Sequence, residues 1–247
     1  MDRLIYTAYS GMSTSMTKQR MIANNMANAQ TVGFRAEMLT TTPMTLKGPS
    51  LEARAMTDGE VYGADMKQGA IIATDNPLDI AMTGKTMLTV QADDGSEAYT
   101  RRGDLAVDAT GLLVNGDGRP VIGSGGPITV PLGSKITVAP DGSVMAADPA
   151  TPDTPPQVVD RIKLVSTDGS PIKKGIDGFF RVEGGGVLPG DEDARVVTGS
   201  LEQSNVNPAD VLVQMIEAQR SFDIRTKLIS TAREVDENSA ALMRISS

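Results

Sequence analysis

Apolar residues recur every three or four positions at both ends of the chain, over residues 1–29 and 205–247. This is the spacing of a helix that buries one face. The stripe in the first segment consists of Ile5, Tyr9, Met12, Met16, Ala23 and Met26. The stripe in the second consists of Leu212, Met215, Phe222, Ile229 and Met243. Such a stripe cannot be buried on an isolated helix. We therefore expect the two helices to pack on each other and then on further copies of the chain.

Local signals predict where the two helices begin and end. The first is expected to open near Asp2, whose carboxylate suits the positive end of the helix dipole, and to stop near Asn28. The second has a good N-cap in Asn207, followed by Pro208 at the first helical position. It is expected to continue to about Met243, because no Gly or Pro follows Pro208.

The region from about residue 76 to residue 199 has the pattern of short strands joined by tight turns. Runs such as 86–90, 135–138 and 161–164 alternate as strands with one buried face do. Asp-Gly pairs that can supply turns recur at 94–95, 117–118, 141–142, 168–169 and 177–178. Residues 36–75 show no lasting period and are expected to form a connector with one hairpin, whereas the proline-rich stretch 148–156 should be a surface loop. The predicted fold class is α+β, with two terminal helices around a mainly-β middle.

Composition excludes several classes of chemistry. The chain has no Cys and no His, which removes disulfides, thiol catalysis, zinc-thiolate sites and the commonest general base. A formal charge of −8 argues against a nucleic-acid-binding protein. No stretch approaches the roughly 20 apolar residues of a membrane helix, and the N-terminus lacks the apolar run of a signal peptide. We expect no cofactor, no bound metal, no membrane insertion and, if the protein leaves the cytoplasm, export without a cleaved signal peptide.

Two acidic clusters allow an enzymatic alternative. Residues 191–193 (Asp-Glu-Asp) and 93–94 (Asp-Asp) could supply a carboxylate pair for cell-wall hydrolysis. Adjacent acids in Gly-rich turns are mostly solvated loops, and no aromatic sugar platform accompanies them. The stretch 115–118 (Asn-Gly-Asp-Gly) falls short of a calcium loop and is explained by a tight turn. We therefore expect that the chain is not an enzyme.

The most specific string in the sequence lies at the end of the first predicted helix, over residues 23–35. Three asparagines there, Asn24, Asn25 and Asn28, are unfavourable by intrinsic helix propensity. They can be explained simply as a helix stop with side chains facing water. The alternative is that their amides form hydrogen bonds across a packed subunit interface. The residues alone leave both explanations open.

Several separated blocks resemble one known family, the bacterial flagellar rod and hook proteins. Residues 23–35 are similar to its N-terminal signature. Further similar blocks, in the family's order, are residues 76–81, 98–104, 108–111, 199–208 and 215–223. The opening residues 1–6 and the short length are most like the proximal-rod type, the F type, with a distal-rod or hook-type axial protein as the alternative. The chain departs from the family pattern at Met87-Leu88, where paired aromatics are common, and at Leu105, where Phe is usual.

The resemblance implies a structural subunit of the proximal rod in the flagellar basal body, a drive shaft that transmits torque for motility. It implies a discontinuous axial domain, residues 1–35 and 204–247, whose helices pair as a coiled coil and polymerise. A connector (36–75) and a β-rich outer domain (76–203) lie between them. Implied partners are copies of the chain, other proximal and distal rod proteins, and the flagellar type III export apparatus. The implied location is a rod that crosses the periplasm.

The stripes and the asparagine string together predict a subunit interface. The residues expected there are Ile5, Tyr9, Met12, Met16, Asn24, Asn25, Asn28, Phe34, Asn205, Asn207, Leu212, Met215, Gln219, Phe222, Ile229 and Met243.

Overall fold

The computed structural model describes residues 2–45, 55–151 and 154–245, and the chain divides into two compact units. The helical unit contains residues up to 27, residues 37–63 and residues from 207 onward. The β unit contains residues 28–36 and 64–206. Most of the predicted connector therefore groups with the helices, while the stretch that follows the first helix groups with the strands.

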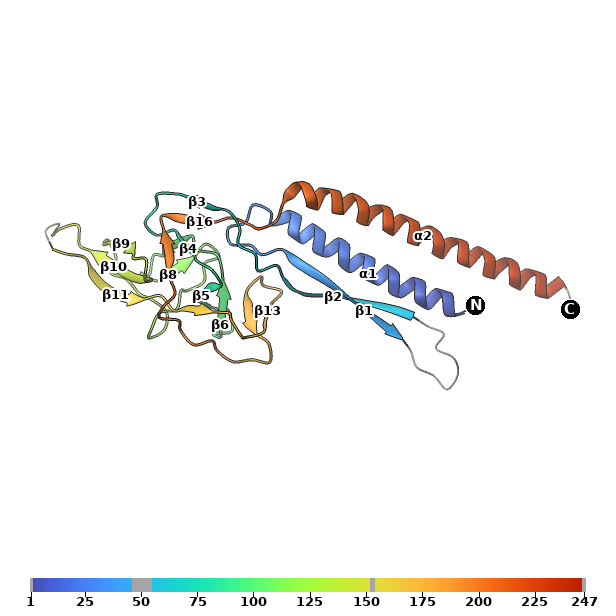
Figure 1. The fold of residues 1–247 in the computed structure, drawn as a ribbon, viewed down its shortest axis with the longest axis horizontal. Helices are drawn as coiled ribbons and strands as arrows, with labels where there is room; N and C mark the ends of the chain where they lie inside the picture. Colours follow the sequence, from blue (N-terminus) through green and yellow to red (C-terminus); the bar gives the residue numbers. More distant parts are fainter. Residues whose placement is uncertain (1, 46–54, 152–153, 246–247) are drawn as a thin grey trace. The chain divides into compact units, whose positions relative to one another are not determined.

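The helical unit is built on the two predicted helices, α1 (Asp2–Ala27) and α2 (Pro208–Ile245). Both boundary predictions are confirmed to within a few residues. The helices lie side by side and run in opposite directions, since the N-terminus of α1 and the C-terminus of α2 lie at the same end (Figure 1). The Asn207 carboxamide accepts a hydrogen bond from the Ala209 amide at 3.0 Å, which confirms Asn207 as the N-cap of α2.

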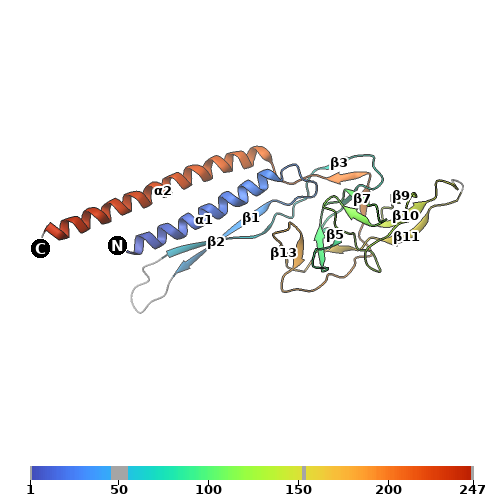
Figure 2. The same cartoon turned by 180° about the vertical axis from the view of Figure 1, so that it is seen from behind.

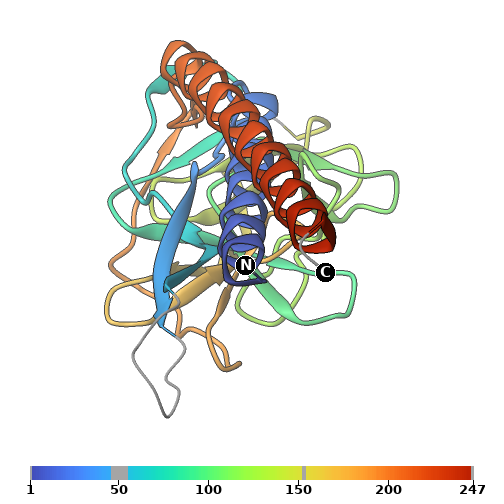
Figure 3. The same cartoon turned by 90° about the vertical axis from the view of Figure 1, so that its right-hand side faces the viewer.

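A two-stranded sheet completes the helical unit. It consists of β1 (Glu37–Thr45) and β2 (Ala55–Ala64) and lies against α1, on the side away from α2 (Figures 2 and 3). Gly59 permits the close approach, because a Cβ atom there would lie 2.6 Å from Cγ2 of Thr14. The single hairpin predicted for this region is thus observed, and α1 has one face on α2 and another on the hairpin.

The β unit holds the remaining strands, all of them short. A five-stranded sheet has the order β12-β5-β6-β14-β13, a three-stranded sheet has the order β11-β10-β9, and the pairs β15-β4, β16-β3 and β7-β8 complete the unit. The strands are β3 (Ile71–Ala73), β4 (Ile80–Met82), β5 (Thr86–Gln91), β6 (Glu97–Thr100), β7 (Leu105–Val107), β8 (Leu113–Asn115), β9 (Lys135–Val138), β10 (Ser143–Ala147), β11 (Gln157–Arg161), β12 (Leu164–Ser166), β13 (Ile172–Lys174), β14 (Phe180–Val182), β15 (Val196–Thr198) and β16 (Ser200–Glu202). The predicted α+β class is confirmed.

β5 in the five-stranded sheet is buried on both faces, which corrects the expectation of one buried face for the run 86–90, whereas β9 (135–138) alternates with one buried face as predicted. On β5, Leu88 points into the main aliphatic core, whereas its neighbour Met87 packs in a second cluster around Tyr99. Phe179 and Phe180 divide between the same two clusters. Adjacent residues of a strand point to opposite faces, so two consecutive apolar residues supply both layers. Met87 and Leu88 therefore fill the two hydrophobic clusters at a position where the family that the chain resembles commonly has paired aromatics.

The Asp-Gly pairs form the predicted turns. All five glycines have positive φ, and three of the pairs join strands that are hydrogen-bonded to each other: β5-β6, β9-β10 and β13-β14. In two of these turns the aspartate accepts hydrogen bonds from the hydroxyl and the amide of the serine two residues on. These bonds hold the pKa below its usual value, mainly through the Ser96 hydroxyl for Asp94 and mainly through the Ser143 amide for Asp141. The run 161–164 is not one strand, however. The chain leaves β11 at Arg161, Ile162 bridges to Gly123, and β12 begins in another sheet.

A buried ionic cluster joins the two ends of the β unit. The Glu202 carboxylate is fully buried and receives Nε and Nη2 of Arg101 at 2.9 and 2.7 Å and the Gly69 amide at 2.8 Å. Nη1 of Arg35 lies 2.5 Å from Oε1 of the same carboxylate, but at an angle outside that of a hydrogen bond. Burial lowers the pKa of Arg101, and the carboxylate partly offsets this. One buried carboxylate thus faces two buried guanidinium groups.

Candidate subunit interface

A subset of the buried and half-buried positions on each of the two helices follows one another in steps of four and three. We call the positions of this subset the seam. On α2 they are Val211, Met215, Ala218, Phe222, Arg225, Ile229 and Ala232. On α1 they are Ala8, Met12, Ser15, Gln19, Ile22 and Met26. Of the predicted interface residues, Met215 and Phe222 line a groove between the two helices together with Gln19 and Ile22, and Met12 and Ile229 are half-buried in the seam.

A different face of α1 is open and partly apolar. Tyr9 is 72% exposed, and Met16 and Ala23 are exposed as well. These three residues are seven apart, so they lie on one line along the helix. The predicted stripe of α1 thus divides between two faces, because its steps of three, four and seven residues extend around more of the helix than one partner covers. We call Tyr9, Met16 and Ala23 the free face of α1.

The free face of α2 is larger and was missed by the sequence reasoning. It consists of the exposed apolar residues Val213, Ile216, Ile224, Leu228 and Val235. Three of them, at 213, 224 and 235, are eleven residues apart, which is close to three full turns of a straight helix. This eleven-residue spacing could have indicated the free face from the sequence, but the prediction rested on the other apolar stripe of the same helix. Leu212, a predicted interface residue, is also exposed.

The asparagines near the end of α1 bind the hairpin. Nδ2 of Asn25 donates to the Glu37 carbonyl at 3.0 Å and its Oδ1 accepts from the Glu37 amide at 2.8 Å. The Asn25 side chain is buried, and its carboxamide bonds to both backbone groups of Glu37 as the backbone of a neighbouring strand would. Nδ2 of Asn24 donates to the carboxylate of the same Glu37 at 2.6 Å. These two amides therefore form bonds within one chain.

Replacing Asn25 with Ala should loosen the start of β1. The amide and the carbonyl of the half-buried Glu37 would each lose a hydrogen bond to the carboxamide, and each bond contributes about 0.5–1.5 kcal/mol. Hydrogen exchange of the peptide around residues 36–42 in the full-length protein measures this, and we expect faster exchange in Asn25→Ala. The control is Asn24→Ala, whose half-exposed carboxamide bonds to a side chain and should change exchange much less. Equal protection in Asn25→Ala and the unmodified chain would contradict the assigned role.

The remaining predicted residues lie at turns or chain junctions. Asn28 accepts from the Thr31 hydroxyl at 3.1 Å in the turn after α1, and the half-buried Phe34 ring has the Lys174 ammonium 3.7 Å from its centroid. The Asn205 carboxamide bonds to the backbone of Ala36, Asp65 and Lys67 within the β unit. Gln219 is exposed. The side chains of Ile5 and Met243 lie outside the described residues.

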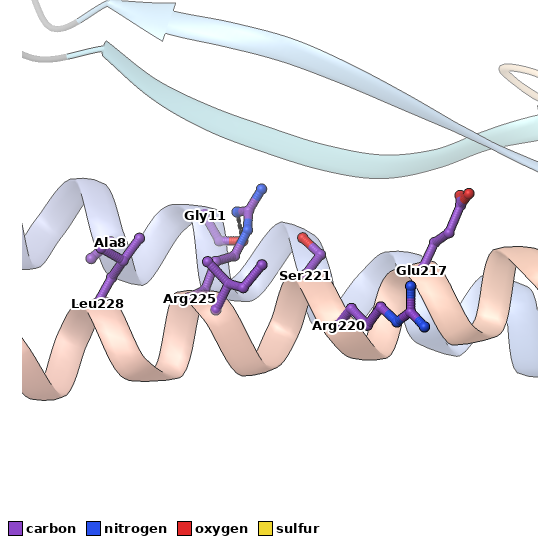
Figure 4. A pocket seen from close by; sticks show the side chains of 8 residues that line it. Ala8, Gly11, Glu217, Arg220, Ser221, Arg225 and Leu228 are labelled. Carbon is purple, nitrogen blue, oxygen red and sulfur yellow. Dashed lines mark hydrogen bonds between the residues drawn. The ribbon is translucent and has the colours of Figure 1, made fainter.

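A groove of about 800 Å³ runs between the two helices (Figure 4). Ala8 and Gly11 of α1 and Ser221, Ile224, Arg225 and Leu228 of α2 line it, with Glu217 and Arg220 at one end. The Arg225 guanidinium donates from α2 to the Gly11 carbonyl of α1. A second, smaller groove between the helices is lined by Gln19, Ile22, Met215 and Phe222 among others.

The acidic clusters form turns. The Asp191 carboxylate accepts from the Asp193 amide at 3.0 Å, and Asp93 pairs with Arg119. Asn115 accepts from the amides of Asp117 and Arg119 around a glycine of positive φ, as a tight turn requires. Within the described ranges, acidic side chains do not gather into a group suited to a metal ion. The same part of the chain contains no helix long and apolar enough to cross a membrane.

Comparison with known proteins gives consistent matches at both ends and in the middle. Three family models match: "Flagella basal body rod protein" over residues 5–35, "Flagellar hook protein FlgE/F/G D1 domain" over 81–146 and "Flagellar basal body rod FlgEFG protein C-terminal" over 197–242. The chain is 42% identical to the flagellar basal-body rod protein FlgF of Salmonella typhimurium and to that of Escherichia coli, each covering 96% of both chains. It is 31% identical to the flagellar basal-body rod protein FlgG of Bacillus subtilis, over 99% of this chain and all of the relative.

These relatives are structural proteins and not enzymes, so the hydrolase alternative is dropped. Similarity of this extent over nearly the whole length, with matching models at both helices and in the β unit, establishes the family. The chain belongs to the flagellar basal-body rod proteins, as a structural rod subunit of the F type.

Proposed function

We propose that the chain builds the proximal part of the flagellar rod by polymerising through its terminal helices. In this proposal α1 and α2 form the axial domain, residues 36–75 connect it to the outer domain, and residues 76–203 form that outer domain. The observation that carries the proposal is the pair of free apolar faces on the helical unit, Tyr9, Met16 and Ala23 on α1 and Val213, Ile216, Ile224, Leu228 and Val235 on α2.

Pairing of α1 and α2 as an antiparallel coiled coil is part of this proposal. It is supported by the four-three spacing of the covered positions on both helices, which is the spacing of knobs packed into holes. It is also supported by their opposite directions within one compact unit (Figure 3). A rigid helix pair of this kind can carry torque along a rod.

The free faces fit assembly with neighbours. Apolar surfaces that remain open on two different helices are not one self-complementary patch, so they favour heterologous contacts, which build open helical assemblies instead of closed dimers. We propose that these contacts join copies of the chain to each other and to other proximal and distal rod proteins. Each large side chain covered in such a contact contributes about 1.5–3 kcal/mol.

We propose that the flagellar type III export apparatus delivers the chain, without a cleaved signal peptide. Its destination in this proposal is a rod that crosses the periplasm. An unfolded passage is compatible with the absence of Cys, since no disulfide has to form or break.

Limited proteolysis of the purified full chain tests the assembly mechanism. Because the free faces lack partners in a monomer, we expect rapid cleavage within residues 2–27 and 208–245 and a resistant core from about residue 70 to residue 200. The same bonds should resist cleavage in isolated basal bodies, which serve as the matched control. Resistant helices in the monomer, or equal cleavage in both states, would overturn the mechanism.

A further inference from the structure

The seam contains the polar residues Ser15 and Gln19 on α1 and one charged residue, Arg225, on α2. Arg225 occupies a seam position on α2, four residues before Ile229 and three after Phe222. It is half-buried there, and its guanidinium donates to the backbone carbonyl of Gly11 on α1 (Figure 4). A charged residue in a seam weakens general packing, so its place needs a reason other than burial.

Gly11 makes room for the arginine. A Cβ atom at this position would lie 2.6 Å from Nη1 of Arg225, so the guanidinium end of this flexible side chain would have to leave its observed place at the Gly11 carbonyl. It is also the one glycine among residues 2–27, in a segment where glycine is the least favourable residue after proline. Gly11 and Arg225 therefore form a matched pair across the two helices. The arginine accounts for a glycine that is unfavourable in α1, and the glycine accounts for a charged residue in the seam of α2.

This match distinguishes one alignment of the helices from its neighbours. Coiled-coil packing repeats every seven residues, so a shift of one heptad returns similar apolar residues to the seam. Shifting α1 by seven residues, however, would place Lys18 opposite Arg225, with like charges together and a Cβ where the glycine was. The other positions of α1 likewise carry a Cβ. We propose that Gly11 and Arg225 set the register of the α1–α2 pair, an inference that rests on the proposed coiled-coil pairing.

Register matters if the helices fold only on joining the rod. Each incoming copy would then have to find the same alignment, because a chain shifted by one heptad would carry its free faces about 10 Å out of step with its neighbours. A polar contact that is satisfied at one alignment alone performs this selection, as single polar residues do in other coiled coils.

The Cys-free sequence allows a direct test by disulfide cross-linking in isolated basal bodies. The pair Ala8→Cys with Leu228→Cys reports the observed register, since both residues line the groove. Pairs of Ala8→Cys with Ser221→Cys and with Val235→Cys report shifts of one heptad in either direction. In the otherwise unmodified chain we expect the first pair to cross-link at least about fivefold more than the other two.

Arg225→Leu should make the three pairs cross-link to within about twofold of one another. Arg225→Lys, which keeps a donor, should restore the preference. Gly11→Ala should relax the register too, although it raises helix propensity, and it serves as the second variant if Arg225→Leu fails to assemble. The matched control is Arg220→Leu, an exposed arginine at the end of the same groove, which should retain the preference.

Two outcomes would overturn the inference, and they are distinguishable. An unchanged preference in Arg225→Leu or Gly11→Ala would show that the pair does not set the register, while the coiled coil stands. Absence of all three cross-links in the otherwise unmodified chain would remove the coiled-coil pairing itself and the register proposal with it.

Discussion

Glu202→Ala is expected to destabilise the β unit by about 3–5 kcal/mol, because removing one partner of a buried ion pair leaves the other charges uncompensated. Here two guanidinium groups, those of Arg35 and Arg101, would remain buried with no carboxylate between them. The Gly69 amide would also lose its acceptor. Since small domains are stable by roughly 5–15 kcal/mol in total, this loss should prevent rod assembly at growth temperature.

Urea-induced unfolding of the full chain, followed by the fluorescence of Tyr99 in a background in which Tyr6, Tyr9 and Tyr62 are replaced by Phe, measures the change in the free energy of unfolding of the β unit. Asp168→Ala is the control, because its carboxylate pairs with Lys85 at a site where both side chains are about two-thirds exposed. An exposed pair of this kind contributes roughly 0–1 kcal/mol. A loss in Glu202→Ala no greater than that in Asp168→Ala would contradict the structural role of the cluster.

The double variant Ile216→Glu, Ile224→Glu should abolish rod assembly while leaving the β unit intact. Both residues belong to the free face of α2, and Ile224 is 62% exposed in the single chain. If neighbouring subunits cover this face, each substitution removes about 1.5–3 kcal/mol of apolar burial and introduces a charge at the contact. The loss recurs at every added subunit, so we expect no isolable rods and no swimming in cells that depend on the variant.

Swimming in soft agar and the yield of basal bodies measure this effect, with urea unfolding as a check that the β unit is unchanged. The control is the double variant Gln214→Glu, Ser230→Glu, which adds the same charge at exposed positions of α2 outside the free face. Control cells should swim. Swimming by cells with the Ile216 and Ile224 variant would show that this face is not a subunit contact.

Local signals in the sequence were sufficient to predict the two helices and the Asp-Gly turns, but not the positions of the strands within 37–73 or the break between β11 and β12. The start of α2 follows from Asn207 and Pro208, because capping and a missing amide act within a few residues of the helix end. The five Asp-Gly pairs predicted their turns for the same reason: only glycine adopts the required positive φ without strain. The class of the fold follows from the change of period between the ends and the middle. Family resemblance, carried by short strings at known positions, indicated the rod.

The partner of each side chain was decided by tertiary structure. The sequence could not divide the stripe of α1 into a seam and a free face, because helical spacing shows that residues share a side but not what covers it. Asn25 and Asn205 were expected at a subunit contact, which stays a prediction, and the bonds observed within the chain run to backbone groups of Glu37 and of residues 36, 65 and 67. Glu202 meets Arg35 and Arg101, 167 and 101 residues away along the chain.

The sequence by itself therefore determined the two helices, the β character of the middle and the Asp-Gly turns, since those preferences are set by neighbours along the chain. The tertiary structure alone decided which faces of α1 and α2 remain open, how the two helices align at Gly11 and Arg225, and which buried charges compensate one another. These outcomes depend on contacts between residues distant in the sequence, and no local pattern specifies them.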